Sequence, residues 1–240
     1  MENSIYIGLS RQMALSRDME IISNNIANLS TPGYRGQNLV FEEYLSDPKG
    51  TDDPLSFVND RGQYEITTPG SVRSTSNPLD VALNGPGFMG VLTEEGETVY
   101  TRAGDFTMDA NGTLLTSAGY SVAGNGGGGI TIPANSTEIK IDENGYISNQ
   151  DGQVGQIMMV EFEDLQELQP LGNNTYATNS APMDPQNTSM KQGYLEGSNV
   201  QPVLEMSRMI EVSRTFQQLQ QTLQGEHERL RNAIQKLLAS

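Results

Sequence analysis

Residues with catalytic or metal-binding chemistry are few in this sequence and poorly placed for it. The only histidine is His227 and cysteine is absent, so Ser-His and Cys-His arrangements have almost nothing on which to build. The absence of cysteine also excludes disulfides, thiolate chemistry and cysteine-ligated zinc. His227 falls in a helical stretch near apolar residues, where a single histidine is more typical of structure than of catalysis.

Carboxylates are plentiful, so composition alone leaves a two-carboxylate hydrolytic mechanism open. The adjacent pairs Asp52-Asp53 and Glu94-Glu95 lie in polar, loop-like sequence, which favours solvated surface. The two Asp-x-Asn-Gly segments that begin at Asp109 and Asp142 do not fit a calcium loop, because an EF-hand needs glycine at position six and glutamate at position twelve. We therefore predict no catalytic residue, no metal site and no cofactor.

The net charge of −16 is confined to the middle of the sequence. Acidic and basic residues balance in 1–37 and again in 193–240, so residues 38–192 carry the whole imbalance. An acidic middle argues against binding nucleic acid and keeps that part solvated. The length of 240 residues suits one large or two modest domains, but 35% hydrophobic residues without tryptophan is lean for one compact core. Some apolar surface is therefore expected to be buried against other molecules.

Both ends of the sequence show helical periodicity. Near the N-terminus the apolar residues recur at steps of three and four: Ile5, Leu9, Leu15, Met19, Ile22, Ile26 and Leu29. Near the C-terminus they form a second stripe: Val203, Met206, Ile210, Phe216, Leu219, Leu223, Leu230, Ile234 and Leu237. Pro32 and Gly33 should end the first helix, and Pro202 suits the first turn of a second helix from about 201 to 238.

Each apolar stripe needs a partner to be stable. The simplest arrangement pairs the two helices in a coiled-coil-like domain, with spare apolar surface facing outward. No segment approaches the ~20 apolar residues of a membrane span, and the N-terminus has neither the basic leader nor the apolar run of a cleaved secretory signal.

The middle of the sequence predicts β structure. Short β-prone runs alternate with Gly, Asn and Asp about every ten residues, as in an all-β domain. Segments 109–119 and 142–152 echo each other and predict two similar hairpins, turned at Asn-Gly because both central residues can adopt positive φ. Gly124–Gly129 should be a loop and not a phosphate site, since no Lys-Ser or Lys-Thr follows it.

The predicted fold class is α+β, with terminal helices and a central all-β domain. The expected boundaries are these: 1–35 for the N-terminal helix, 36–76 for a connector, 77–176 for the β domain, 177–192 for a second connector and 193–240 for the C-terminal helix.

Three segments together resemble the axial protein family of the bacterial flagellum, which comprises rod and hook subunits. Ser23–Arg35 resembles the N-terminal motif of that family, Gly193–Val200 resembles the turn that opens its closing helix, and Leu79–Phe88 with Tyr100–Phe106 is similar to its β-domain motif. The matching motif residues at the two ends are Asn24, Asn25, Ala27, Asn28, Thr31, Pro32, Gly33, Tyr34, Ser198, Asn199 and Val200. The resemblance covers both ends and most of the middle.

The resemblance implies a structural subunit of the flagellar basal-body rod and not an enzyme. The short length and single modest β domain favour a proximal-rod subunit over a distal-rod or hook subunit, and Met89 departs from the second aromatic residue often found there. Such subunits are exported through the flagellar type III apparatus without a cleaved signal. They stack helically with copies of themselves and with other proximal and distal rod proteins into a drive shaft that crosses the periplasm and transmits torque to the hook and filament.

The assembly interface is accordingly expected on the two apolar stripes together with Asn25, and no nucleic acid or small-molecule substrate is expected. Two readings from other classes stay open. A periplasmic carboxylate-based hydrolase should show a pocket with converging polar groups in the β domain. A coiled-coil adaptor that presents a β domain to a ligand should form a closed, small oligomer.

Overall fold

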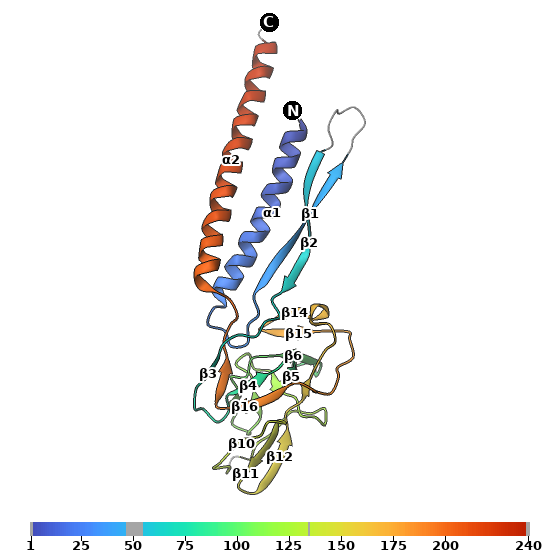
Figure 1. Cartoon of the computed structure of the whole chain (residues 1–240), viewed down its shortest axis with the longest axis vertical. Helices are drawn as coiled ribbons and strands as arrows, with labels where there is room; N and C mark the ends of the chain where they lie inside the picture. The colour runs from blue at the N-terminus through green and yellow to red at the C-terminus, as the bar shows by residue number, and fades with distance from the viewer. Residues whose placement is uncertain (1, 47–54, 134, 239–240) are drawn as a thin grey trace. The chain divides into compact units, whose positions relative to one another are not determined.

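The protein divides into two compact units in the computed structural model, which describes residues 2–46, 55–133 and 135–238 (Figure 1). Unit 1 holds both terminal segments, Met1–Ala27 and Gln201–Ser240, together with Gln37–Glu65. Unit 2 holds Asn28–Gly36 and Ile66–Val200. The architecture is α+β, with a helix at each end and β-rich sequence between them, as the sequence predicts.

Unit 1 consists of two helices and a β-hairpin. Its elements are α1 (Glu2–Ala27), β1 (Gln37–Ser46), β2 (Leu55–Glu65) and α2 (Pro202–Leu238). Helices α1 and α2 lie side by side and run in opposite directions, and the hairpin packs along α1 (Figure 1). The predicted C-terminal helix is confirmed, with Pro202 in the first turn, where its missing N–H costs nothing.

The β1–β2 hairpin lies in the segment 36–76 that the sequence analysis expects to be a connector. The strands pair antiparallel from Gln37↔Glu65 to Ser46↔Leu55, with a bulge between Val40 and Phe41. A bulge shifts the alternation of side chains by one residue, so the period-2 pattern that would reveal the strand is interrupted. The turn between the strands, and with it the Asp52-Asp53 pair, lies outside the described residues.

Unit 2 is built from short strands. The strands in its first half are β3 (Val72–Ser74), β4 (Val81–Asn84), β5 (Phe88–Leu92), β6 (Thr98–Thr101), β7 (Thr107–Met108), β8 (Leu114–Leu115) and β9 (Ser121–Val122). Those in its second half are β10 (Lys140–Ile141), β11 (Tyr146–Asn149), β12 (Gly152–Gln156), β13 (Met159–Val160), β14 (Gln169–Gly172), β15 (Thr175–Ala177), β16 (Ser189–Gln192) and β17 (Tyr194–Glu196), with a 3₁₀ turn at Leu165–Glu167.

The strands of unit 2 form one large sheet and several small ones. The large sheet has the order β14-β15-β6-β5-β9-β8-β7, with β13 also paired to β5, and β10-β11-β12 form a three-stranded sheet. Strands β3 and β4 pair with β17 and β16, so the first strands of unit 2 lie beside its last. Because early and late segments pair directly, the β unit is closed by contacts distant in sequence.

The core of unit 2 has an aliphatic part and an aromatic part. The mainly aliphatic part, which holds one aromatic residue, is buried among the sheets and includes Val81, Leu83, Met89, Phe106, Leu114, Val122, Ile132, Ile147, Ile157 and Met190. In the aromatic part Phe88 meets Phe162 and Tyr176 edge to face, with ring centroids 6.0 and 5.6 Å apart. Edge-to-face packing of this kind adds roughly 0.5–1.5 kcal/mol per pair beyond area burial.

The two predicted Asn-Gly hairpins are present, but their turn chemistry differs from the prediction. β7 pairs with β8 around Gly112, and β10 pairs with β11 around Gly145. Only the glycines adopt positive φ, at 86° and 80°. The preceding aspartate organises each turn: Asp109 Oδ1 accepts from the backbone N–H groups of Asn111 and Thr113, at 2.9 and 2.7 Å. These turns are therefore aspartate-stapled turns with a left-handed glycine after them.

Gly124–Gly129 forms the expected loop, closed by a hydrogen bond of 2.7 Å from Gly124 N to Gly128 O. The β-prone run 129–132 that follows it contributes isolated bridges, such as Thr113↔Thr131, in place of a regular strand.

Gly104 is predicted to be indispensable to the β unit, because a Cβ there would lie 1.8 Å from the carbonyl oxygen of Val81. Backbone atoms cannot move aside as a flexible side chain can. Gly104→Ala should therefore lower the free energy of unfolding by at least about 2 kcal/mol. Gly128→Ala is the matched control, since nothing lies within 4 Å of its Cβ position. Urea denaturation of both variants checks this, and equal stabilities would contradict it.

Candidate functional site

A buried polar cluster joins the elements of unit 1. Asn25 on α1 is 1% exposed, and its carboxamide forms two hydrogen bonds with the main chain of Gln37 on β1. Asn25 Oδ1 accepts from Gln37 N at 3.0 Å, and Asn25 Nδ2 donates to Gln37 O at 2.9 Å. The same Nδ2 lies 3.4 Å from Glu205 Oε2 on α2. One residue therefore holds the first helix to the hairpin and to the last helix.

Arg208 completes this cluster from α2. Its Nη1 donates to Asn38 Oδ1 at 2.7 Å and lies 3.4 Å from Glu205 Oε1, while its Nη2 lies 3.4 Å from Asp18 Oδ1 on α1. Asp18 and Glu205 are both buried. Two buried carboxylates thus share one guanidinium, and removing the guanidinium would leave uncompensated charge inside the unit.

Burial in this cluster has an electrostatic consequence at Asp18. Burial raises the pKa of Asp18 above its ordinary value of 3.8, attraction to Arg208 partly opposes the rise, and repulsion from Glu205 adds to it. The folded unit therefore holds the proton of Asp18 more tightly than the unfolded chain does, so the contribution of Asp18 to stability is present at low pH and is lost as pH rises through the raised pKa.

The helices pack through an inner apolar face. On α2 the half-buried residues Met209, Val212, Phe216, Leu219 and Leu223 recur at steps of three and four. This spacing is that of a coiled-coil seam. On α1, Gly8 is buried against Leu223, and a Cβ at Gly8 would lie 2.6 Å from Leu223 Cδ2. The glycine permits close approach of the two helices at this level.

A second, outer set of apolar residues stays exposed on the same helices. We define the outer face as these residues: Tyr6, Leu9 and Met13 on α1, and Val203, Leu204, Met206, Ile210 and Ile234 on α2. Val203 is 79% exposed and Met13 is 67% exposed. The steps 6-9-13 and 203-206-210 place each group along one side of its helix.

The structure divides the predicted interface residues between these two faces. Buried or half-buried are Leu15, Met19, Ile22, Asn25, Ile26, Leu29, Phe216, Leu219 and Leu223. Exposed are Leu9, Val203, Met206, Ile210 and Ile234. The side chains of Ile5, Leu230 and Leu237 lie outside those that the structure describes. The sequence assigned one stripe to each helix, whereas each helix carries an inner and an outer face.

The two terminal motifs meet inside unit 2. Gly33 N donates to Glu196 O at 2.8 Å, and Asn199 N donates to Tyr34 O at 3.2 Å. Asn199 Oδ1 accepts from Gly36 N at 2.7 Å, while its Nδ2 donates to the carbonyl oxygens of Ile66 and Thr68, both at 2.8 Å. Asn199 therefore links the N-terminal motif, the return of the backbone at Ile66 and the C-terminal motif.

The remaining motif residues surround this junction or flank it. Gly33 and Val200 are buried, and Asn28, Thr31, Pro32, Tyr34 and Ser198 are half-buried. In unit 1, Asn24 and Ala27 are exposed. Gly33 has φ of +66°, and its Cβ position lies 2.5 Å from the carbonyl carbon of Arg102, so only glycine fits there.

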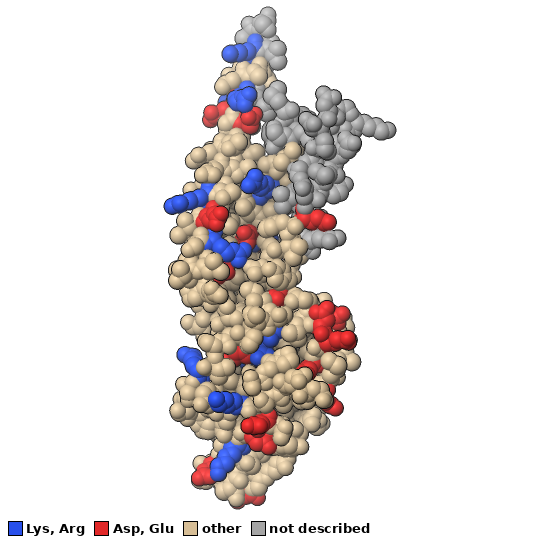
Figure 2. Space-filling model, in the orientation of Figure 1, with Lys and Arg blue, Asp and Glu red and all other residues tan. Residues whose placement is uncertain are grey.

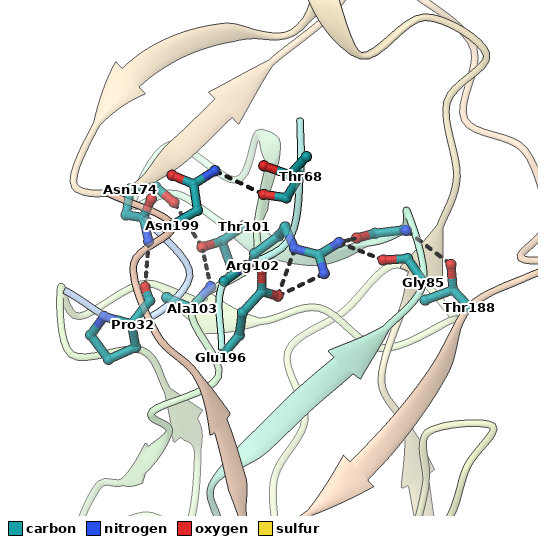
Figure 3. A network of polar contacts seen from close by, with 12 residues as sticks. Pro32, Thr68, Gly85, Thr101, Arg102, Ala103, Asn174, Thr188, Glu196 and Asn199 are labelled. Atoms are coloured by element: carbon teal, nitrogen blue, oxygen red, sulfur yellow. Dashed lines mark hydrogen bonds and ion pairs between the residues drawn. The ribbon is translucent and has the colours of Figure 1, made fainter. Parts of the chain in front are cut away.

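Beside this junction lies a fully buried ion pair (Figure 3). Arg102 Nε and Nη2 donate to Glu196 Oε2 at 2.9 and 2.6 Å, and Arg102 Nη1 donates to the carbonyl oxygens of Gly85 and Gly87 at 3.0 and 2.5 Å. The two charged residues are 0% and 2% exposed. Glu196 Oε1 accepts from Gly70 N at 3.0 Å. The pair thus holds four segments together, and its remaining polar atoms are satisfied as burial requires.

An aromatic ring flanks the buried guanidinium. The guanidinium carbon of Arg102 lies 5.7 Å from the centre of the Phe88 ring, and that of Arg35 lies 4.9 Å from it.

Sequence reasoning placed Arg35, Phe88 and Arg102 in motifs without assigning them a role. For Asp18 and Arg208 the available signal was a charged residue with apolar residues four positions before and after it in a helix.

The described residues offer little to chemistry. His227 is exposed on α2, and Glu94 and Glu95 are exposed in unit 2. No group of three or more His, Cys, Asp or Glu residues within the described ranges could hold a metal ion. Neither helix, over its described length, combines enough length and apolar character to cross a membrane.

Comparison with known proteins places this geometry in a family. The family "Flagella basal body rod protein" matches residues 5–35, "Flagellar hook protein FlgE/F/G D1 domain" matches 82–149, and "Flagellar basal body rod FlgEFG protein C-terminal" matches 191–236. The flagellar basal-body rod protein FlgF of Caulobacter vibrioides is 38% identical, over 99% of this chain and 98% of that protein. FlgG of the same organism is 35% identical, over 87% of this chain and 89% of that protein.

The protein therefore belongs to the family of flagellar basal-body rod proteins and is a structural subunit of that rod. Within the family it is of the FlgF type, since FlgF of Caulobacter vibrioides aligns at higher identity and over more of the chain than FlgG of that organism. FlgF of Mesorhizobium japonicum also aligns, at 35% identity over 90% of each sequence. The resemblance stated from the three sequence motifs is thereby confirmed.

Breaking the buried ion pair should be costly. Arg102→Met leaves the Glu196 carboxylate buried without its cation, so the free energy of unfolding should fall by about 3–5 kcal/mol. Lys140→Met removes a cation from an ion pair with Glu138 whose members are 75% and 72% exposed, and should cost under about 1 kcal/mol. Chemical denaturation of both variants checks the ranking, and a cost for Arg102→Met as small as that of Lys140→Met would contradict it.

The stability of unit 1 should change with pH in the direction that the raised pKa of Asp18 dictates. The wild-type unfolding free energy should fall as pH rises through the raised pKa of Asp18, and Asp18→Asn should flatten that part of the profile. Circular dichroism at the far-ultraviolet helix band, which follows the helices, measures this. An unchanged slope in Asp18→Asn would refute the assignment.

Glu161 in unit 2 should affect stability with the opposite pH dependence. Burial opposes its ionisation, but hydrogen bonds from Thr188 Oγ1, Asn187 N and Gln186 N, at 2.7, 2.7 and 3.1 Å, outweigh burial and lower its pKa. Its contribution is present at neutral pH and lost as pH falls through the lowered pKa, so Glu161→Gln should destabilise unit 2 at neutral pH and not at strongly acid pH.

Proposed function

We propose that the outer face of unit 1 is the surface through which this rod subunit packs against neighbouring copies and other rod proteins. The observation that carries the proposal is the separation of two apolar faces on the same helices. The inner face is satisfied within the subunit, whereas the outer face has large apolar residues exposed to solvent. Exposed apolar surface gathered along two helices is typical of a protein-protein contact.

The magnitudes favour a lattice over a single weak contact. Completing the burial of a half-exposed Leu, Ile or Met recovers on the order of 1 kcal/mol. The outer face has eight large apolar residues, six of which are Leu, Ile or Met, and association costs about 4–15 kcal/mol in lost translational and rotational freedom. When a single neighbour covers the outer face, the free energy of burial exceeds the cost of association by little. A subunit that contacts several neighbours gains this free energy of burial at each contact. Heterologous contacts of this kind propagate into open helical stacks.

The charge distribution fits the same proposal. On the side seen in Figure 2, uncharged residues cover much of unit 1, and basic and acidic residues are interspersed over it. Its two terminal segments are neutral, so contacts between copies along the helices face little net repulsion, whereas the hairpin segment 37–65 holds seven acids and two bases. The acidic residues concentrated in 38–192 would keep other surfaces solvated.

In this proposal the helices form a coiled-coil-like inner domain and the β unit is the outer domain of a tube. The domain boundaries expected from the sequence are kept in this proposal, except that the hairpin at 37–65 is assigned to the helical domain. The tube would be the proximal part of the rod that crosses the periplasm and transmits torque. The subunit would reach it through the type III export apparatus without a cleaved signal, and would have no enzymatic activity.

The hydrolase alternative gains no support from the described cavities of unit 2. A cavity of about 350 Å³ is lined by Glu167, Thr178, Asn179 and Ser180, with Gln169 and Ala177, and so holds one carboxylate. That carboxylate already accepts from the Ser180 hydroxyl. A two-carboxylate mechanism needs a second acid within about 5–10 Å across a substrate cleft. A distal-rod or hook position is the nearer alternative, since FlgG relatives also align.

Charge on the outer face should block assembly while leaving the subunit folded. Met206 and Ile210 are 50% and 54% exposed, so replacing both by Glu should change subunit stability by only about 0.5 kcal/mol each. In the rod the same carboxylates would be buried without partners. Cells that carry Met206→Glu with Ile210→Glu should lack motility, and electron micrographs of their basal bodies should show a rod that stops short.

Leu171→Glu is the matched control, because Leu171 is 60% exposed on β14 and lies off the outer face. It should support normal swimming. Full motility and complete rods in the double variant would sink the proposal, as would complete rods in a strain that lacks this subunit.

A further inference from the structure

The sequence contains four Asn-Gly pairs, at Asn84, Asn111, Asn125 and Asn144. Asn-Gly is the dipeptide in which the amide nitrogen of the following residue most easily attacks the asparagine carboxamide, because glycine has no Cβ to obstruct the approach and moves freely in φ and ψ. The reaction requires a near-attack geometry between that nitrogen and the asparagine Cγ. Whether each pair can reach this geometry depends on how its backbone is held.

Three of the four pairs are held firmly, two of them in the same way. Gly112 N and Gly145 N donate to the carbonyl oxygens of Asp109 and Asp142, at 3.1 and 3.0 Å, inside the two aspartate-stapled turns. Both glycines are buried. An attacking nitrogen in these turns must first lose its hydrogen bond and rotate within a packed site.

The pair at Asn84 is held in a different way. Asn84 is paired with Ser189 at the end of β4, and Gly85 O accepts from Arg102 Nη1 at 3.0 Å. The Cβ position of Gly85 lies 2.2 Å from Asn187 O, so the backbone there has no room to turn.

The pair at Asn125 lies in the loop Gly124–Gly129 and differs on each count. Asn125 and Gly126 are exposed, and nothing lies within 4 Å of the Cβ position of Gly126. Among the described residues, the Gly126 N–H donates no backbone hydrogen bond. Three further glycines follow, and the loop borders a cavity of about 310 Å³ that admits water. Such a segment opens locally at low free-energy cost.

We propose that Asn125 is a site of spontaneous deamidation in the folded protein. The Gly126 amide nitrogen gives up its proton and bonds to Cγ of Asn125. The bond between Cγ and Nδ2 breaks, and Nδ2 takes up a proton and leaves as ammonia, so that a five-membered succinimide remains. One molecule of solvent water then opens the ring at either carbonyl. The products are aspartate, or isoaspartate with the backbone rerouted through Cβ and Cγ, and no oxidant or reductant takes part.

The modification has a defined structural effect. Asn125 Nδ2 donates to Gln156 Oε1 at 3.1 Å, and Gln156 Nε2 donates to Asn144 O at 3.1 Å, so Gln156 ties the loop to the neighbouring turn. A carboxylate at position 125 cannot donate to Gln156 Oε1, and it adds a negative charge to the acidic part of the protein. The reaction therefore removes the side-chain link between the loop and β12, and leaves the backbone hydrogen bond of 3.0 Å from Asn125 N to Gln156 O as the remaining tie between these two residues.

The test is incubation of the purified full-length protein in heavy-oxygen water at mildly alkaline pH, followed by tryptic mapping. Asn111 and Asn125 fall in one peptide, Ala103–Lys140, so fragment ions must assign the label between them. The label should appear at position 125 at least about tenfold faster than at 84, 111 or 144. Equal or slower labelling at 125, or no label at any of the four, overturns the proposal.

Two comparisons separate the fold from the local sequence. In denaturing urea all four pairs should react at similar rates, and an unchanged lead for Asn125 there would show that the fold does not set the difference. Gly126→Ala, which fits in open space, should slow labelling at 125 alone, whereas Gly128→Ala should leave it unchanged. A rate at 125 that Gly126→Ala does not alter would also contradict the mechanism. None of these results bears on the proposed role in the rod.

Discussion

The helical unit depends on the polar cluster around Asn25 and Arg208. A guanidinium and two carboxylates removed from water are tolerable only while each keeps its partners, because a lone buried charge costs several kcal/mol. Asp18 and Asn25 come from the first helix, Glu205 and Arg208 from the last, and Asn38 from the hairpin. Apolar seams allow helices to slide by a turn, but this set of polar contacts fixes one register. The cluster therefore sets which residues face inward and which are left outside.

The same constraint appears in the β unit. Arg102 and Glu196 are buried together, and Glu196 joins the C-terminal motif to the turn at Gly33 and to Gly70. Motif residues thus make their contacts within one subunit, Asn25 in unit 1 and Asn199 in unit 2. The resemblance that identifies the family is carried largely by residues that shape the subunit. In our proposal, contacts with neighbours fall to less distinctive apolar residues on the outer face.

Periodicity and turn chemistry predicted much of the fold. The step pattern of α2 indicated its extent, and the spacing of Gly, Asn and Asp indicated a β middle with two related turns. The hairpin at 37–65 was missed because the bulge at Val40 and Phe41 breaks the alternation on which strand prediction depends.

The candidate site was predicted only in part, for a physical reason. A helical stripe shows which residues are apolar but not which neighbour covers them, so inner residues such as Leu219 and outer ones such as Ile210 look alike in sequence. Asp18 and Arg208 were missed because charged residues in helices are usually solvated, and only the fold brings them together. The stapling aspartates were visible in the sequence, yet the turns were assigned to the Asn-Gly pairs.

A structure of the assembled rod by electron cryomicroscopy, at a resolution that shows individual residues, tests the central claim most directly. The account predicts that Tyr6, Met13, Val203 and Ile210 lie buried against neighbouring subunits while the contacts of Arg208 with Asp18 and Asn38 stay as they are in the single subunit. Outer-face residues open to solvent in the finished rod, or an Arg208 that leaves Asp18 to pair with a neighbour, would contradict it.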